Sequence, residues 1–93
     1  RLNTQGLFKG YPPVMKTVTV HYFAALRERK GCDQERCDVQ PGENIAALYT
    51  RLFPGPAANR IPVGYAVNQT YVPGTTELKE GDEVTFVPPI GGG

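Results

Sequence analysis

The sequence predicts an α+β fold in which one main helix covers a mixed sheet of four to five strands. Two observations support this prediction. Segments in which apolar and polar residues alternate, the period of half-buried strands, lie on both sides of one segment with the apolar period of a helix. That helix has a single apolar stripe and must therefore lie against a sheet. A chain of 93 residues forms only one such two-layer core.

The first strand is expected over residues 17–23, where the alternation begins. Its inward face would carry Val18, Val20 and Tyr22. Its outward face would carry Thr17, Thr19, His21 and Phe23. A short helical turn over residues 24–31 would follow, ended by Gly31.

A second strand is expected over residues 35–40, ended by the turn at residues 41–42. Cys37 and Val39 would point inward, and Arg36 and Asp38 outward. The main helix is predicted to follow, with Asn44 as its N-cap and residues 54–55 as its end. Its apolar stripe consists of Ile45, Leu48, Tyr49, Leu52 and Phe53.

Three more segments with strand character follow the helix. Val63, Tyr65 and Val67 alternate as a strand, residues 68–69 form a turn, and residues 70–72 form a short return strand. After a turn over residues 79–82, the last strand would bury Val84 and Phe86.

If the last strand pairs beside the first, this order of elements forms the β-grasp, or ubiquitin-like, arrangement. We expect the domain to span residues 15–87. Residues 1–14 would be an N-terminal extension or a segment foreign to the natural chain, with Met15 as the natural start. Residues 88–93 would be a flexible C-terminal tail.

The composition, with 40% hydrophobic and 20% charged residues, is typical of a folded soluble domain. The net charge of +1 offers no electrostatic basis for binding nucleic acid. No apolar run is long enough to span a membrane, and the start has no secretory pattern, so we expect a cytoplasmic protein that does not contact membranes.

The sequence contains no obvious active site or metal site. Cys32 and Cys37 do not form a C-x-x-C pair, and with His21 they are too few to hold a metal, so reduced structural thiols are expected. His21 itself is expected at the surface. Glu80, Asp82 and Glu83 cluster around a turn, where such residues serve the backbone, so catalysis by them is disfavoured.

The C-terminal stretch "VPPIGGG" offers a different kind of chemistry. Two prolines fix the direction in which the chain leaves the last strand, and residues 88–93 can reach about 20 Å when extended. Glycines have no side chain, so the end can thread a narrow channel. The carboxylate of Gly93 is sterically open, but it needs activation by ATP before a nucleophile can attack it. The tail is therefore predicted to present its carboxyl group to a partner's active site.

The stretches "VHYFAALRE", "YAVNQTYV" and "LKEGDEVTFVPPI", together with the final Gly92-Gly93, resemble the small-subunit family of molybdopterin synthase, which are ubiquitin-like sulfur carriers. The resemblance covers nearly all of residues 15–93. Gly91 departs from it, because relatives often have another small residue there. The related thiamine sulfur carriers share the fold and the Gly-Gly end, but residues 88–89 look more like the molybdopterin family.

The resemblance implies a non-catalytic sulfur-donor subunit. A ubiquitin-activating-like adenylyltransferase would adenylate the carboxylate of Gly93 with ATP, and a sulfurtransferase would supply sulfur to form a thiocarboxylate. The tail would then enter the large synthase subunit and donate sulfur to precursor Z (cyclic pyranopterin monophosphate), forming the dithiolene of molybdopterin. The active assembly would be a heterotetramer. This chain itself would bind no cofactor and no metal.

A docking patch for both partners is predicted beside the tail. Phe23 and Val87 are apolar residues in the outward register of the first and last strands, and Tyr71 lies on the short strand. The resemblance implies contacts at these three positions and at Arg27 beside them. The tail residues expected to contact a partner are Pro88, Pro89, Ile90, Gly91 and Gly92.

Three alternatives stay open at this point. The chain could carry sulfur for thiamine or for another pathway. It could be a protein modifier whose Gly93 is joined to lysines of target proteins, as ubiquitin is. It could also be a β-grasp binding module in which the glycines have no role.

Overall fold

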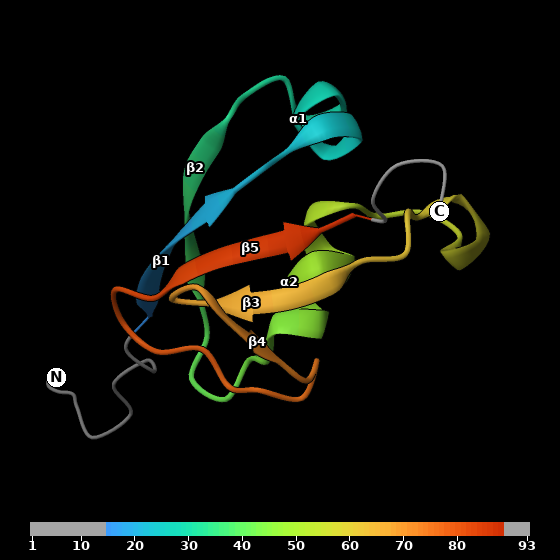
Figure 1. Cartoon of the computed structure of the whole chain (residues 1–93). Helices are drawn as coiled ribbons and strands as arrows, with labels where there is room; N and C mark the ends of the chain where they lie inside the picture. Colours follow the sequence, from blue (N-terminus) through green and yellow to red (C-terminus); the bar gives the residue numbers. More distant parts are fainter. Residues whose placement is uncertain (1–14, 89–93) are drawn as a thin grey trace, which may run out of the picture.

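A computed structural model describes residues 15–88 of the chain (Figure 1). Its five strands are β1 (Lys16–His21), β2 (Gln34–Val39), β3 (Gly64–Val67), β4 (Thr70–Val72) and β5 (Glu83–Val87). They form one sheet in the order β2-β1-β5-β3-β4. β1 and β5 are parallel and the other neighbours are antiparallel. The last strand therefore lies beside the first, as the β-grasp prediction requires.

Helix α2 (Ile45–Leu52) covers one face of this sheet (Figure 1). Asn44 caps it as predicted, because its side-chain oxygen accepts a hydrogen bond of 2.8 Å from the Ala47 N–H. The helix ends at Leu52, just before the predicted Pro-Gly stop, and Phe53 is its buried C-cap. Ile45, Leu48 and Tyr49 form the buried face, which confirms the predicted apolar stripe.

Two shorter helical segments connect the strands. Helix α1 (Ala24–Lys30) links β1 to β2, and Gly31 ends it in the left-handed region with φ of +77°. A 3-10 helix, η1 (Ala57–Asn59), lies in the loop before β3. Leu26 of α1 is fully buried, so this predicted turn also closes one end of the core.

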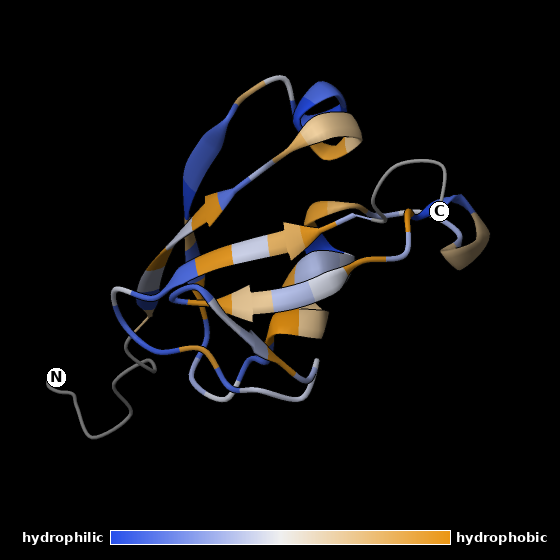
Figure 2. Cartoon of the chain, viewed as in Figure 1, coloured by the Kyte–Doolittle hydropathy of each residue, from blue (hydrophilic) through white to orange (hydrophobic). Residues whose placement is uncertain are grey.

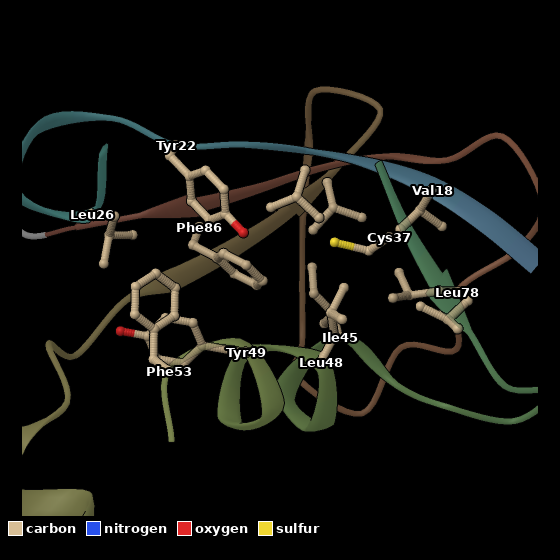
Figure 3. Close-up of a cluster of buried hydrophobic side chains, with 13 residues drawn as sticks. Val18, Tyr22, Leu26, Cys37, Ile45, Leu48, Tyr49, Phe53, Leu78 and Phe86 are labelled. Atoms are coloured by element: carbon tan, nitrogen blue, oxygen red, sulfur yellow. The ribbon is translucent and has the colours of Figure 1, made fainter. Parts of the chain in front are cut away.

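The core lies between the sheet and α2, and the hydrophobic residues alternate along β1 and β5 (Figure 2). Val18, Val20 and Tyr22 point inward from β1 and the residue after it, and Val84 and Phe86 point inward from β5, as predicted. Aromatic rings gather at one end (Figure 3). There the ring centroid of Tyr49 lies 4.8 Å from that of Phe86 and 5.1 Å from that of Phe53.

The loop from β4 to β5 contributes a core residue that the sequence analysis did not single out. Leu78 lies between two turns, where no period marks it, and it is fully buried in the same core cluster (Figure 3). The prediction for β3 is confirmed: Val63, Tyr65 and Val67 are partly buried and pack against the core. The turn at Asn68 and Gln69 is also confirmed, because both residues have the positive φ of a tight hairpin.

The three carboxylates around the last turn hold backbone and side-chain partners, which agrees with a structural role. Glu80 accepts a hydrogen bond from the Thr17 N–H at 2.9 Å, and Asp82 accepts one from the Lys79 N–H at 2.8 Å. Glu83 lies 2.7 Å from a nitrogen of His21. The turn also ties to β1 through its backbone, because Gly81 donates to the Thr17 carbonyl at 2.8 Å.

A polar cluster closes the core near α1. The Tyr22 hydroxyl donates to Glu35 at 2.5 Å, and the Lys30 ammonium lies 3.4 Å from the same carboxylate oxygen. Burial, and then the bond to Glu35, raises the pKa of Tyr22 far above its usual value. Burial also raises the pKa of the Cys37 thiol. Both cysteines are free, in agreement with the prediction of structural thiols.

Residues 15–88 contain no helix with the length and apolar character needed to cross a bilayer. Within the same range, acidic, histidine and cysteine side chains do not gather in groups that could hold a metal ion. The predicted extension over residues 1–14 lies outside the described residues. So does all of the predicted tail after Pro88.

Candidate docking surface on the outer face of the sheet

The face of the sheet opposite α2 is called the outer face here, and the strand register sets the order of its side chains. His21 of β1 is the Cα partner of Thr85 of β5. Thr85 in turn pairs with Ala66 of β3, and Ala66 pairs with Tyr71 of β4. Partners on neighbouring strands point to the same face, so these four residues form one row across the outer face.

A second row lies closer to the end of β5. Val87 is the Cα partner of Gly64 on β3. On the other side of β5, strand β1 ends at His21. Phe23 comes two residues later, as the N-cap of α1. The predicted pair Phe23 and Val87 therefore lies at the same end of two neighbouring strands. Tyr71 lies two strands from Val87, with β3 between them.

Exposure separates these positions from the core. Phe23 is 53% exposed and Tyr71 is 73% exposed, whereas Val87 is partly buried. Between the two aromatic residues, β3 contributes only Gly64 and Ala66 to the outer face. A Cβ at Gly64 would meet only the carbonyl oxygen of Val87, at 4.0 Å. The outer face therefore combines exposed aromatic side chains with a strand, β3, whose two residues on this face have little or no side chain.

Arg27 lies one helical turn after Phe23. Its backbone N–H bonds to the Phe23 carbonyl at 3.4 Å, which places the two side chains on neighbouring positions of the α1 surface. Its guanidinium lies 3.8 Å from the carboxylate of Asp33, and both groups are exposed. Such a pair contributes little to stability and is available to a partner.

The chain leaves the sheet at the same end. β5 is the middle strand of the five. It ends at Val87, at the same end of the sheet as β1, and Pro88 follows (Figure 1). The predicted tail residues Pro89, Ile90, Gly91, Gly92 and Gly93 lie outside the described residues. Pro88, the last described residue, directly follows Val87, the Cα partner of Gly64.

His21 has a partner that sequence reasoning missed. The residue was predicted as a lone surface histidine, but its Nε2 lies 2.7 Å from Glu83 Oε1, and its side chain is only 27% exposed. The alternation in the sequence places both residues on the outward face. Their contact depends on the parallel register of β1 and β5, which no local pattern reports.

A hollow of about 460 Å³ lies at the opposite end of the sheet, at the start of β1. Met15, Gln40, Pro41, Gly42, Glu43 and Arg51 line it. The charges in it are already paired, because the Arg51 guanidinium lies 3.1 Å from Glu43. Neither Phe23 nor Tyr71 lines this hollow.

Comparison with known proteins identifies the family of the chain. The sequence model of the ThiS family matches residues 20–93. A relative from Mycobacterium tuberculosis, named molybdopterin synthase sulfur carrier subunit, is 39% identical over 85 residues, and the match covers 85% of this chain and 100% of the relative.

Two solved structures share the fold. One, from Pyrococcus furiosus, is provisionally named subunit 1 of molybdopterin converting factor; it is 29% identical with a TM-score of 0.67, and the match covers 81% of this chain and 99% of that one. The other is small archaeal modifier protein 1 from Methanosarcina acetivorans, which is 26% identical with a TM-score of 0.63 over 86% of this chain and 99% of that one.

Proposed function

Because the chain belongs to the ThiS family, we propose that it is a sulfur carrier and serves as the small subunit of molybdopterin synthase. The observation that carries this proposal is the match to the mycobacterial sulfur carrier subunit, which extends over the whole length of that relative. The fold agrees with the role, since residues 15–88 form a compact support and the last strand leads directly into the tail.

In the proposed reaction, a carboxylate oxygen of Gly93 attacks the α-phosphate of ATP in a separate adenylyltransferase and releases pyrophosphate. The terminal sulfur of a persulfide on a sulfurtransferase then displaces AMP from the acyl-adenylate, which gives an acyl disulfide between Gly93 and the donor. A thiol attacks the donor's sulfur in this S–S bond, so the thiocarboxylate leaves and the donor is released as a disulfide with that thiol. Sulfur is a softer and better nucleophile than the carboxylate oxygen, so the thiocarboxylate suits transfer to precursor Z in the large subunit.

The described residues support a binding role for the domain rather than a catalytic one. Within residues 15–88, carboxylates such as Glu80 and Asp82 are engaged in turns, and Tyr22 is kept neutral in the core. The exposed outer-face residues Phe23 and Tyr71 offer apolar contact area, and Arg27 offers a charge beside them. We propose that the large subunit and the adenylyltransferase both dock there, and that two copies of each synthase subunit form the active heterotetramer.

Intact-mass measurement tests the sulfur-carrier function. The full chain is incubated with the adenylyltransferase, ATP and a sulfur donor. We expect a mass gain equal to the replacement of one oxygen by sulfur, located at Gly93 by fragmentation. Adding the large subunit and precursor Z should return the mass to its starting value as molybdopterin forms. A chain that never gains sulfur under these conditions would contradict the proposal.

A protein-modifier function is the second candidate, because the archaeal structure with 26% identity is named as a modifier. A modifier would appear as a ladder of conjugates on other proteins when the chain is expressed with an affinity tag in its own cell. A carrier would appear as the free chain with its thiocarboxylate. Removal of Gly92-Gly93 should abolish either function, whereas a binding module with idle glycines would keep its activity.

A further inference from the structure

Ala24, the first residue of α1, has a backbone angle that alanine rarely adopts. Its φ is +52°, in the left-handed region, where the methyl group of an L-residue crowds the backbone. Within residues 15–88, the other non-glycine residues with positive φ are Asn68 and Gln69, which form the tight β3–β4 hairpin that needs such angles. Ala24 joins a strand to a helix, so its angle needs a different explanation.

The positive φ belongs to a sharp turn between β1 and α1. The Phe23 carbonyl accepts hydrogen bonds from the Leu26 N–H at 3.0 Å and from the Arg27 N–H at 3.4 Å. Ala24 takes the first central position of the turn that the bond to Leu26 closes. Positive φ at this position alone is the pattern of a type II′ turn, where glycine is usual. An alanine is therefore strained at a position that suits glycine.

Packing inside the domain does not account for this alanine. Ala24 is exposed, so its methyl group fills no space in the core. Phe23 breaks a second local rule, because it is the N-cap of α1 but makes no side-chain capping bond, and it is 53% exposed. A polar cap followed by glycine would suit the same backbone better. Two adjacent residues that are locally unfavourable indicate a functional requirement at this turn.

The turn determines how Phe23 is presented. Phe23 has extended backbone, with φ of −128° and ψ of 153°, so it continues the outward alternation after the buried Tyr22. Leu26, three residues later, is again fully buried. The chain therefore changes direction at Ala24, directly after Phe23. Alanine has far fewer accessible backbone conformations than glycine, so it restricts this turn and the residue before it.

We propose that Ala24 is a positioning residue for docking: its restricted backbone at positive φ holds Phe23 in the orientation that the large subunit binds. A contact residue that is already ordered loses less conformational freedom on binding, which strengthens binding. A glycine would relieve the strain at Ala24 but would let the turn move, and Phe23 with it. This inference rests on the proposed function, because it takes the large subunit as the partner that covers Phe23.

Titration calorimetry and thermal unfolding of the full chain test the two sides of the inference. For Ala24→Gly, we expect the dissociation constant with the purified large subunit to rise about threefold to fivefold. Its Tm should be at least as high as that of the wild type, since glycine relieves the strain. Ala25→Gly is the matched control, because this exposed neighbour has no positive φ. That exchange relieves nothing, so its Tm should fall by about 4 °C.

A double-mutant cycle shows whether Ala24 acts through Phe23. In the background of Phe23→Ala, the exchange of Ala24 for glycine should no longer change the dissociation constant. An effect of the same size in both backgrounds would mean that the alanine methyl contacts the partner directly. That result would overturn the inference.

Replacing Ala24 by its D-enantiomer separates strain from restriction. Gly31 and Cys32 allow the full chain to be assembled by native chemical ligation of a synthetic segment 1–31 to an expressed segment 32–93. D-alanine favours positive φ, so it keeps the turn restricted without strain. Compared with the L-alanine chain made in the same way, Tm should rise and the dissociation constant should stay within about twofold. A larger loss of affinity would contradict the positioning role.

The outcomes are distinguishable. Equal dissociation constants for the wild type and Ala24→Gly would overturn this inference and leave the proposed function standing. A lower Tm for Ala24→Gly would show that the alanine stabilises the domain, and would also overturn it. Absence of docking by the wild-type chain would overturn the proposed docking surface and this inference with it.

Discussion

Val20 and Val84 are Cα partners on the parallel strands β1 and β5, and both side chains are fully buried against α2. This contact joins the first and last strands of the chain. It also aligns the ends of the two strands, so that Phe23, just after β1, and Val87, the last residue of β5, lie at the same end of the sheet. The surface beside the tail therefore depends on a core contact between residues 64 positions apart in the sequence.

Phe23→Asp is predicted to weaken binding to the large subunit roughly tenfold or more, because a charge replaces an exposed aromatic contact. Its free energy of unfolding should stay within about 0.5 kcal/mol of the wild type, since Phe23 is 53% exposed. Calorimetry and urea unfolding measure the two quantities. Met15→Asp is the control, because Met15 is 46% exposed at the opposite end of β1 and should not affect binding. Equal affinity of the two variants would remove Phe23 from the surface.

Gly92→Val is predicted to block adenylation or sulfur transfer without changing the unfolding transition. The added side chain widens a segment that has to enter a narrow channel. Gly92 lies outside the described residues, so the prediction rests on the sequence. Pyrophosphate release measures adenylation, and intact mass measures sulfur transfer. Gly91→Ala should keep most of both activities. Normal sulfur transfer by the valine variant would contradict threading.

Gly74→Ala is predicted to destabilise the domain by about 1–3 kcal/mol. A Cβ at Gly74 would lie 3.0 Å from Ala46 Cβ and 3.0 Å from Tyr65 Cε2, so the loop and α2 would have to move apart. Gly64→Ala is the matched control, because its Cβ would meet only a carbonyl oxygen at 4.0 Å. Urea unfolding should show a clear loss for the first variant and almost none for the second.

Asn44→Ala is predicted to lower the free energy of unfolding by about 1 kcal/mol, because the Ala47 N–H loses its capping oxygen. Asn44→Ser keeps a capping oxygen and should lose much less. Thermal or urea unfolding of both variants measures the difference. Equal losses would mean that the side chain of Asn44 stabilises the fold by some contact other than the cap.

The stability of the domain is predicted to fall at alkaline pH. Burial raises the pKa of Tyr22 and Tyr49 in the folded state, so their neutral forms stabilise the fold fully below the unfolded-state pKa of about 10. As the pH rises above that value, the unfolded chain loses its protons first and the stabilisation is lost. Cys37, whose pKa is also raised, acts in the same direction from a slightly lower pH.

Tyr22→Phe tests this assignment by urea unfolding between about pH 7 and pH 11. At neutral pH the variant should be about 1 kcal/mol less stable, because Glu35 loses the hydroxyl that donates to it. Above about pH 10 its stability should decline less steeply than that of the wild type. Parallel curves for the two proteins would show that Tyr22 does not cause the alkaline loss.

Local patterns in the sequence determined which residues face inward and where the elements end. The alternation around Val18 and Val20 and the stripe from Ile45 to Tyr49 each involve neighbouring residues, and burial follows directly from their spacing. Asn44 and Gly31 mark helix ends for equally local reasons, a capping oxygen and a positive φ. The family resemblance, and with it the role expected of Gly92 and Gly93, also followed from the sequence alone.

Only the tertiary structure decided which outward residues meet. The contact of His21 with Glu83 and the row from His21 to Tyr71 depend on strand register, which is set by pairing between segments far apart in the chain. Leu78 is buried although no period surrounds it, because its loop is held against the start of α2, where the Leu78 N–H donates to the Glu43 carbonyl at 3.1 Å. A two-residue period determines which face a side chain occupies, but its neighbour across the sheet depends on non-local hydrogen bonds.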